Sequence, residues 1–143
     1  MSTNKKIYLF GLVLSMGIFT TTAIGVGSML SGKRMKENAT TTYLTINDND
    51  ATVSVKKGDQ VSLELKDYGD GGYSWTLVAL DQSILSLTQR SDSQPSGLMG
   101  DCGNDIWIFT AEHPGSTTLH LLCDRPWNTT DTCATFTVQI HVL

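Results

Sequence analysis

Basic residues are scarce in this chain, and so are histidine and cysteine. The 143 residues include 10 Lys and Arg against 14 Asp and Glu, with only three His and three Cys. Two of the basic residues, Lys5 and Lys6, lie near the N-terminus, so eight basic residues stand against all 14 acidic ones from Lys33 onward. A chain without a basic patch or stripe lacks the usual electrostatic basis for binding nucleic acid. We therefore expect no nucleic-acid partner.

The sequence also shows no group of residues arranged as in a catalytic site. Catalysis calls for a nucleophile beside a base, a pair of carboxylates or a metal cluster. His113 precedes Pro114 in a turn, while His120 and His141 fall on outward-facing positions of expected strands, without ligand spacing. Cys102 has no basic neighbour that would make its thiol acidic. We expect no catalytic residue, no metal site and no cofactor, and thus no enzyme.

No window of the mature chain shows the 3.6-residue apolar period of an amphipathic helix. Apolar and polar residues instead alternate in short segments separated by turn residues, which is typical of half-buried β-strands. The clearest segment is 133–142, in which Ala134, Phe136, Val138, Ile140 and Val142 would face inward. The expected strands are 41–46, 51–55, 60–65, 73–80, 84–88, 105–111, 116–123 and 133–142. Seven to eight strands at this spacing predict an all-β, immunoglobulin-like antiparallel β-sandwich, in which alternate loops gather at the same end.

The N-terminal segment reads differently from the rest of the chain. Lys5 and Lys6 precede an apolar run over residues 7–18, followed by small residues suited to cleavage, which is the pattern of a signal peptide. The stretch is also long enough to span a bilayer, so a signal anchor is the alternative. We expect a signal peptide or anchor over residues 1–32, a polar linker over 33–40 and the β domain over 41–143. Either reading places the domain outside the cytosol, as a secreted, periplasmic or cell-surface protein.

Three cysteines in an exported chain predict one disulfide and one free thiol. Cys123 and Cys133 flank one loop, and they would lie at bridging distance if the strands on either side pair with each other. Pairing of Cys102 with either of them stays open at this stage. The sequons at Asn38 and Asn128 are potential glycosylation sites.

Three loops have an unusual composition. In Arg125-Pro126-Trp127, proline fixes φ, tryptophan supplies a broad apolar face and arginine a planar fork of donors, which suits an anchor for another protein. The alternative is a turn whose tryptophan folds back onto its own domain. Gly69, Gly71 and Gly72 would let another molecule approach the main chain closely, unless they merely form a flexible hairpin turn.

These loops resemble, in order and spacing, the three loop motifs of the chagasin family of cysteine-peptidase inhibitors. Gly72-Tyr73-Ser74-Trp75 matches the end of the first motif, Gly100-Asp101-Cys102-Gly103 with Trp107-Ile108-Phe109 the second, and Arg125-Pro126-Trp127 the third. The resemblance extends over residues 41–143. Two departures stand out: Tyr68-Gly69-Asp70-Gly71 replaces the family's Asn-Pro-Thr-Thr, and Cys102 replaces a glycine.

The resemblance implies a monomeric, reversible and non-covalent inhibitor of papain-like cysteine peptidases, with three loops that plug the active-site cleft. The peptidase-binding residues that it implies are Tyr68, Gly69, Asp70, Gly71, Gly72, Tyr73, Gly100, Asp101, Cys102, Gly103, Arg125, Pro126 and Trp127. The alternative is an exported adhesion or ligand-binding β-sandwich at the cell surface. Its binding could depend on calcium held by the acid-rich turn 47–50 or by Asp67 with Asp70.

Overall fold

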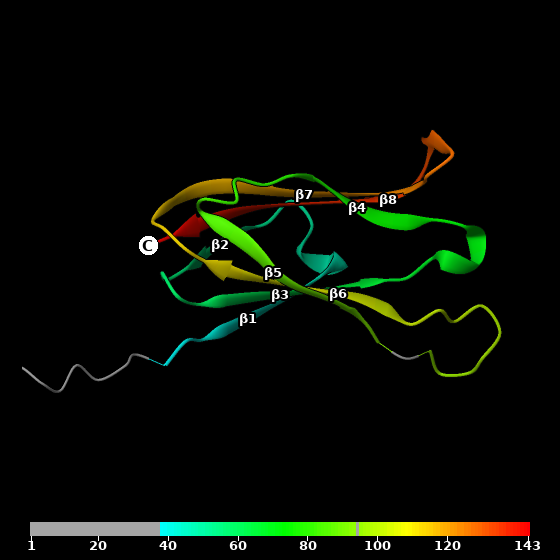
Figure 1. Cartoon of the computed structure of the whole chain (residues 1–143), viewed down its shortest axis with the longest axis horizontal. Coiled ribbons are helices and arrows are strands. Elements are labelled where there is room, and N and C mark those ends of the chain that lie inside the picture. The colour runs from blue at the N-terminus through cyan, green and yellow to red at the C-terminus, as the bar shows by residue number, and fades with distance from the viewer. Residues whose placement is uncertain (1–37, 94) are drawn as a thin grey trace, which may run out of the picture. The chain divides into compact units, whose positions relative to one another are not determined.

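Eight β-strands in two four-stranded sheets make up most of the computed structural model, which describes residues 38–93 and 95–143 (Figure 1). The expected leader, 1–32, and most of the expected linker lie outside the described residues. Each of the eight expected strands is confirmed. The elements are β1 (Thr41–Thr45), η1 (Ile46–Asp48), β2 (Thr52–Val55), β3 (Gln60–Lys66), η2 (Gly69–Gly71), β4 (Ser74–Ala79), β5 (Leu85–Asp92), β6 (Asn104–Ala111), β7 (Gly115–Arg125) and β8 (Asn128–Val142).

The two sheets pack face to face as the expected sandwich. One sheet has the strand order β1-β3-β6-β5 and the other β2-β8-β7-β4. The interior pairings β3–β6 and β7–β8 are antiparallel, and so are β5–β6 and β4–β7. Two edge strands add in parallel instead, β1 to β3 and β2 to β8. Among the described residues the helices are two 3₁₀ turns of three residues each, and neither is long or apolar enough to cross a membrane.

The core lies between the sheets and follows the alternation of the sequence. In β3, Val61, Leu63 and Leu65 are buried while the residues between them are not. In β8 the expected inward residues from Phe136 to Val142 are buried, and Ala134 is half-buried against them. Because a strand turns alternate side chains to opposite faces, this pattern fixes which face of each strand meets the second sheet.

Two strands are longer than the alternation of apolar residues predicts. β5 continues to Asp92 rather than ending at residue 88, and β8 begins at Asn128 rather than at 133. Residues 128–132 carry no apolar side chain, so they show no inward face, yet they pair with the end of β7. As a result β7 and β8 are joined by only two residues, Pro126 and Trp127.

All three unusual loops lie at one end of the sandwich, on the right in Figure 1. We call this the loop end. The first loop, residues 67–73, joins β3 to β4; the second loop, 93–103, joins β5 to β6; the third loop is the Pro126-Trp127 turn between β7 and β8. The turns 56–59, 80–84 and 112–114 lie at the opposite end. Gly72, Cys102 and Trp127 therefore share one pole of the domain.

Candidate protein-binding surface

The first loop is anchored at its root and has glycines on both sides of Asp70 at its tip. Trp75, buried in β4, donates its indole N–H to the carbonyl of Lys66 at 2.9 Å, which ties the two limbs of the loop together. Asp67 accepts a hydrogen bond from the N–H of Gly69 at 2.7 Å, and η2 follows. Gly72 has φ +77°, a left-handed conformation that glycine adopts readily and other residues rarely. The tip is thus a defined turn in which Asp70 is the one residue with a side chain among the glycines.

Trp127 of the third loop packs against this tip. A Cβ placed on Gly72 would lie 2.5 Å from Cη2 of the indole, so the ring rests directly on the main chain of Gly72. The indole is nevertheless 73% exposed. Both sequence-based readings of this tryptophan therefore contain part of the answer: one edge contacts its own domain, and most of the ring faces outward.

Arg125 makes three contacts, two with the first loop and one with Asp131 of its own hairpin. Its Nε donates to the carbonyl of Gly71 at 3.1 Å, its Nη1 forms an ion pair with Asp131 at 2.7 Å, and its guanidinium lies 4.5 Å from the centre of the Tyr73 ring. The hydroxyl of Tyr73 donates to the other oxygen of Asp131 at 3.0 Å, and this hydrogen bond raises the pKa of Tyr73. Sequence analysis did not identify Asp131, because a single acid in a polar run carries no signal.

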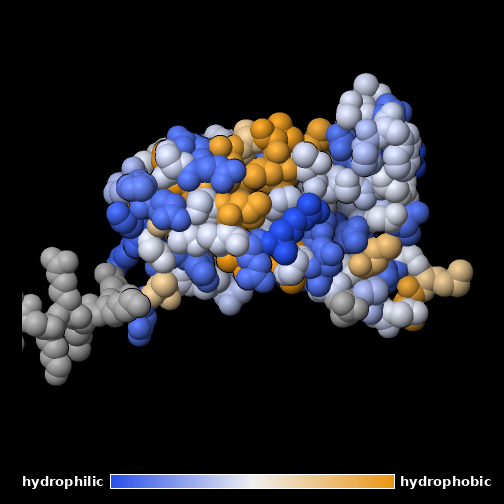
Figure 2. Space-filling model, in the orientation of Figure 1, coloured by the Kyte–Doolittle hydropathy of each residue, from blue (hydrophilic) through white to orange (hydrophobic). Residues whose placement is uncertain are grey.

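The second loop is closed by one carboxylate and carries an apolar tip. Asp101 accepts hydrogen bonds from the N–H groups of Ser96 and Gly103, each at 2.9 Å; hydrogen bonding from Ser96 is the largest cause that lowers the pKa of Asp101 to about 2. At the tip, Leu98 is 74% exposed and Met99 fully exposed. On the lower right of Figure 2, at the loop end, apolar residues lie beside paler and hydrophilic ones. Sequence analysis missed both residues, although adjacent large apolar residues between turn residues were a usable signal.

The second loop also contacts the first. The N–H of Asp67 donates to the carbonyl of Gly103 at 3.0 Å. A Cβ on Gly100 would lie 3.7 Å from a carboxylate oxygen of Asp70. These contacts join the roots and the tips of the two loops, so all three loops form one continuous surface.

A buried acid lies beneath the second loop. Asp105, at the start of β6, is paired in register with Asp92 of β5 and Leu65 of β3, and lies 3.6 Å from Arg90. Burial, helped by a hydrogen bond with Asp92, raises the pKa of Asp105 to about 6, against the lowering effect of Arg90. The raised pKa means that Asp105 takes up a proton at a mildly acidic pH at which an ordinary aspartate stays ionised.

The cysteines pair as the strand geometry allows. Cys123 and Cys133 form a disulfide with their Cα atoms 5.4 Å apart, and Cys102 in the second loop is free. The disulfide lies on the β7–β8 hairpin, where the register shifts beside Cys123, so it staples the strands that carry the third loop. Such a bond is typical of proteins in oxidising compartments.

In the acid-rich turn 47–50, side-chain oxygens of two residues already accept hydrogen bonds from backbone N–H groups. Asp48 accepts a hydrogen bond from the N–H of Thr45 at 2.8 Å, and Asn49 accepts one from Thr137 at 2.8 Å. Within residues 38–93 and 95–143, no group of three or more His, Cys, Asp or Glu side chains is arranged to hold a metal ion.

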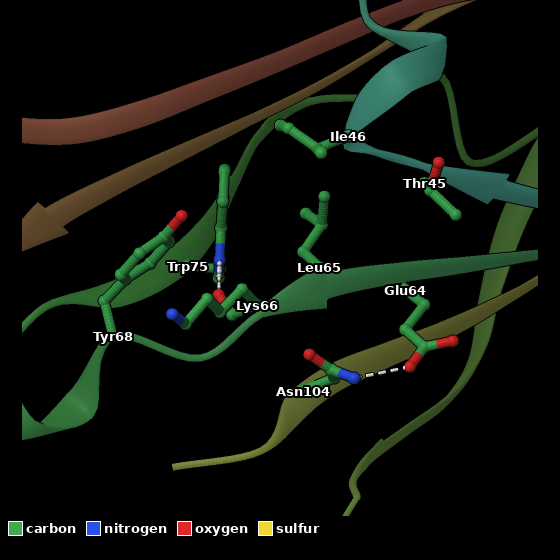
Figure 3. Close-up of a pocket in the computed structure, with 8 residues that line it drawn as sticks. All are labelled: Thr45, Ile46, Glu64, Leu65, Lys66, Tyr68, Trp75 and Asn104. Atoms are coloured by element: carbon green, nitrogen blue, oxygen red, sulfur yellow. Dashed lines mark hydrogen bonds between the residues drawn. The ribbon is translucent and has the colours of Figure 1, made fainter. Parts of the chain in front are cut away.

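A cavity of about 350 Å³ lies at the side of the first loop (Figure 3). Tyr68 stands at one side and Ile46 of η1 at another, with the Trp75–Lys66 hydrogen bond between them. Asn104 donates to Glu64 at 2.6 Å along its rim. The lining residues are Thr45, Ile46, Glu64, Leu65, Lys66, Tyr68, Trp75 and Asn104.

A β-sandwich that presents three interconnected loops, glycine main chain and exposed apolar side chains at one end has a surface suited to binding another protein. The sequence profile of the chagasin family of peptidase inhibitors (I42) matches residues 54–142. The chain therefore belongs to the chagasin family of peptidase inhibitors, which are not enzymes.

Individual relatives agree with this membership. The chain is 27% identical over 100 residues to amoebiasin-1 of Entamoeba histolytica. The aligned region covers 69% of this chain and 97% of the relative. The solution structure of amebosin is similar with a TM-score of 0.60 and 26% identity, over 74% of this chain and 100% of that one. The fold is shared with EhICP2, a cysteine protease inhibitor from Entamoeba histolytica (TM-score 0.66, 18% identity, 75% and 99% covered). It is shared also with PbICP-C, solved in complex with falcipain-2 (TM-score 0.56, 18% identity, 75% and 95% covered).

Proposed function

We propose that this protein inhibits papain-like cysteine peptidases reversibly and without covalent chemistry, by inserting its three loops into the active-site cleft. The observation that carries the proposal is the convergence of the loops: Trp127 rests on Gly72, and Arg125 hydrogen-bonds to Gly71, across more than 50 residues of sequence. Family membership supports the inhibitory role, and a relative of the same fold has been solved with a peptidase, falcipain-2.

The first loop would occupy the centre of the cleft. Its glycines carry no side chains, so the main chain can lie against the catalytic thiolate of a peptidase where a larger residue would clash. The tip is curled into η2 and the left-handed Gly72, and this turn offers no extended peptide bond in attack geometry. The loop would therefore bind without being cleaved.

The flanking loops would hold the two sides of the cleft. Trp127 presents a broad, mostly exposed indole face that can stack on an apolar wall of the peptidase. On the other side, Leu98 and Met99 add apolar side chains to the glycine-rich segment 100–103. Because contacts between the loops hold them in place before binding, they lose little conformational freedom on docking, which favours tight binding.

A titration of active papain with the protein tests the proposal. We expect residual activity to fall to zero near equimolar ratio and to return on dilution, with the mass of both proteins unchanged. Excess chelator should have no effect, because no metal ion takes part. Full peptidase activity at a large molar excess of the protein, or a covalent adduct, would contradict it. We also propose, from the leader pattern and the disulfide, that the protein acts after export.

A further inference from the structure

We infer that Asp131 is a positioning residue: through Arg125 and Tyr73 it holds the first loop and Trp127 in the arrangement that binds the peptidase. This inference rests on the proposed function for its consequence, and on the side-chain contacts at the loop end for its geometry.

The carboxylate of Asp131 is used on both oxygens. Oδ1 accepts the hydroxyl of Tyr73 at 3.0 Å, and Oδ2 accepts Nη1 of Arg125 at 2.7 Å. The guanidinium and the Tyr73 ring also face each other, 4.5 Å from carbon to ring centre. Tyr73 comes from the end of the first loop, whereas Arg125 and Asp131 come from the β7–β8 hairpin. The three side chains therefore form a closed triangle between two loops.

The triangle reaches the loop tip through a second nitrogen of the arginine. Nε of Arg125 donates to the carbonyl of Gly71, which belongs to the peptide bond that leads into Gly72. Trp127 rests on Gly72. A contact path thus runs from Asp131 through Arg125 and Gly71 to the indole that we propose as an anchor. With its guanidinium engaged by Asp131, Gly71 and the Tyr73 ring, Arg125 acts on its own domain more than on the partner.

The exposure of the pair separates positioning from general stabilisation. The side chains of Arg125 and Asp131 are 34% and 35% exposed, and ion pairs at such sites contribute little to global stability. Loss of the carboxylate should instead free Arg125 to turn toward solvent, which releases the Gly71 carbonyl. The expected signature is a loosened loop end on an intact sandwich.

The test compares Asp131→Asn with Glu112→Gln. Glu112, hydrogen-bonded to Ser86 at the opposite end, provides a control that also removes one negative charge and one charged acceptor. For Asp131→Asn we expect the inhibition constant against papain to rise about tenfold. The unfolding temperature should fall by less than about 5 °C. In a Trp127→Ala background the same substitution should change inhibition less than about twofold, because both act through one anchor.

A structural readout makes the outcome independent of inhibition. The protein has three tryptophans, so the side-chain indole N–H groups give three NMR signals, and the Trp127 signal is the one missing from Trp127→Ala. In Asp131→Asn the Trp127 signal should shift and its heteronuclear NOE should fall, while the buried Trp75 and Trp107 keep theirs.

Each result decides one question. An unchanged Trp127 signal in Asp131→Asn overturns the inference, even if inhibition weakens, since Asp131 would then contact the peptidase itself. An equal effect of Glu112→Gln on that signal also overturns it. If the wild-type protein does not inhibit papain, the proposed function fails, and the NMR comparison alone still decides whether Asp131 positions the loops.

Discussion

The two ends of the sandwich are closed in different ways. At the opposite end, acidic side chains cap the backbone of their own turns: Asp59 accepts from the N–H of Lys56, three residues away, and Asp81 from Ser83, two residues away. At the loop end, Arg125 reaches Gly71 across 54 residues and Tyr73 reaches Asp131 across 58. The turns at the opposite end also contact one another, as where Nδ1 of His113 lies 2.9 Å from the carbonyl of Ser83. Those contacts hold turns only, whereas the contacts at the loop end hold the exposed Trp127.

The difference shows what a binding surface requires beyond a stable fold. A local cap is sufficient for a turn that only reverses the chain. Exposed apolar side chains that must meet a partner in fixed positions need support from outside their own loop, since mobile loops lose more entropy on binding. The network between the first and third loops provides that support for Trp127.

Of the substitutions described below, the addition of a methyl group at Gly72 should disturb the loop end most. Gly72→Ala combines the strain of φ +77° with a Cβ 2.5 Å from the Trp127 ring, so the first loop and the indole cannot both keep their places. We expect inhibition of papain to weaken by about 3 kcal/mol, or roughly a hundredfold.

Gly58→Ala is the matched control at the opposite end. Gly58 has φ +90° and nothing within 4 Å of an added Cβ, so the variant suffers similar backbone strain without a clash. Its inhibition constant should equal that of the wild type, and its stability should fall by about 1 kcal/mol. Equal inhibition by the two variants would show that the Gly72–Trp127 contact does not matter for binding.

The disulfide is the covalent part of the loop-end network. Replacing both Cys123 and Cys133 by Ala should lower the free energy of unfolding by about 2.5 kcal/mol, because the cross-link restricts the unfolded hairpin. Thermal unfolding of this variant is compared with that of Cys102→Ala, which removes the free thiol alone. Identical unfolding temperatures for the two variants would exclude a stabilising role for the bond.

Asp105 at the loop end and Asp59 at the opposite end should respond to pH with opposite sign. The raised pKa of Asp105, about 6 against 3.8, means that the folded state holds its proton more tightly than the unfolded state. The associated stability is fully present below pH 3.8 and is lost as pH rises through about 6. Asp105→Asn should therefore unfold with a free energy higher than wild type by on the order of 2 kcal/mol at pH 7.5, with little difference at pH 4.

Asp59 provides the contrast. The pKa of Asp59 is lowered, chiefly by a hydrogen bond from the N–H of Thr40, so its stabilisation is present above pH 3.8 and is lost as pH falls further. Asp59→Asn should then destabilise the protein at pH 7.5. Urea unfolding at several pH values measures both variants, and a shift of the same sign in both would refute this assignment of the two acids.

The smallest of these effects concerns the exposed indole by itself. Trp127→Ala should weaken inhibition by more than about 1 kcal/mol, the usual cost of losing an aromatic anchor, without unfolding the domain. Tyr43→Ala, which removes a 77% exposed aromatic from β1, is the control and should inhibit normally. Unchanged inhibition by Trp127→Ala would remove Trp127 from the binding surface.

Alternation predicted the strands because one face of each meets the core. Phe136, Val138 and Ile140 show the buried face of β8 directly in the sequence. Alternation did not predict a strand over residues 128–132, because they pair with β7 but bury no apolar side chain. It also could not reveal that β1 and β2 join their sheets in parallel, since alternation looks the same in either direction.

The motifs identified the three loops that meet at the loop end but not the contacts between them. Arg125 and Tyr73 were visible as unusual residues, whereas the carboxylate that joins them, Asp131, looks in sequence like any other surface acid. The contact of Trp127 with Gly72 depends on how two loops 55 residues apart meet in space. Such relations become predictable only when the fold places the loops at one end.

The most direct measurement is hydrogen–deuterium exchange of the backbone amides with and without papain. We expect papain to slow exchange in residues 67–73, 96–103 and 125–128, and to leave the turns 56–59 and 80–84 at the opposite end unchanged. Slower exchange at those opposite turns, or inhibition of papain with no slowing in the three loops, would contradict the account.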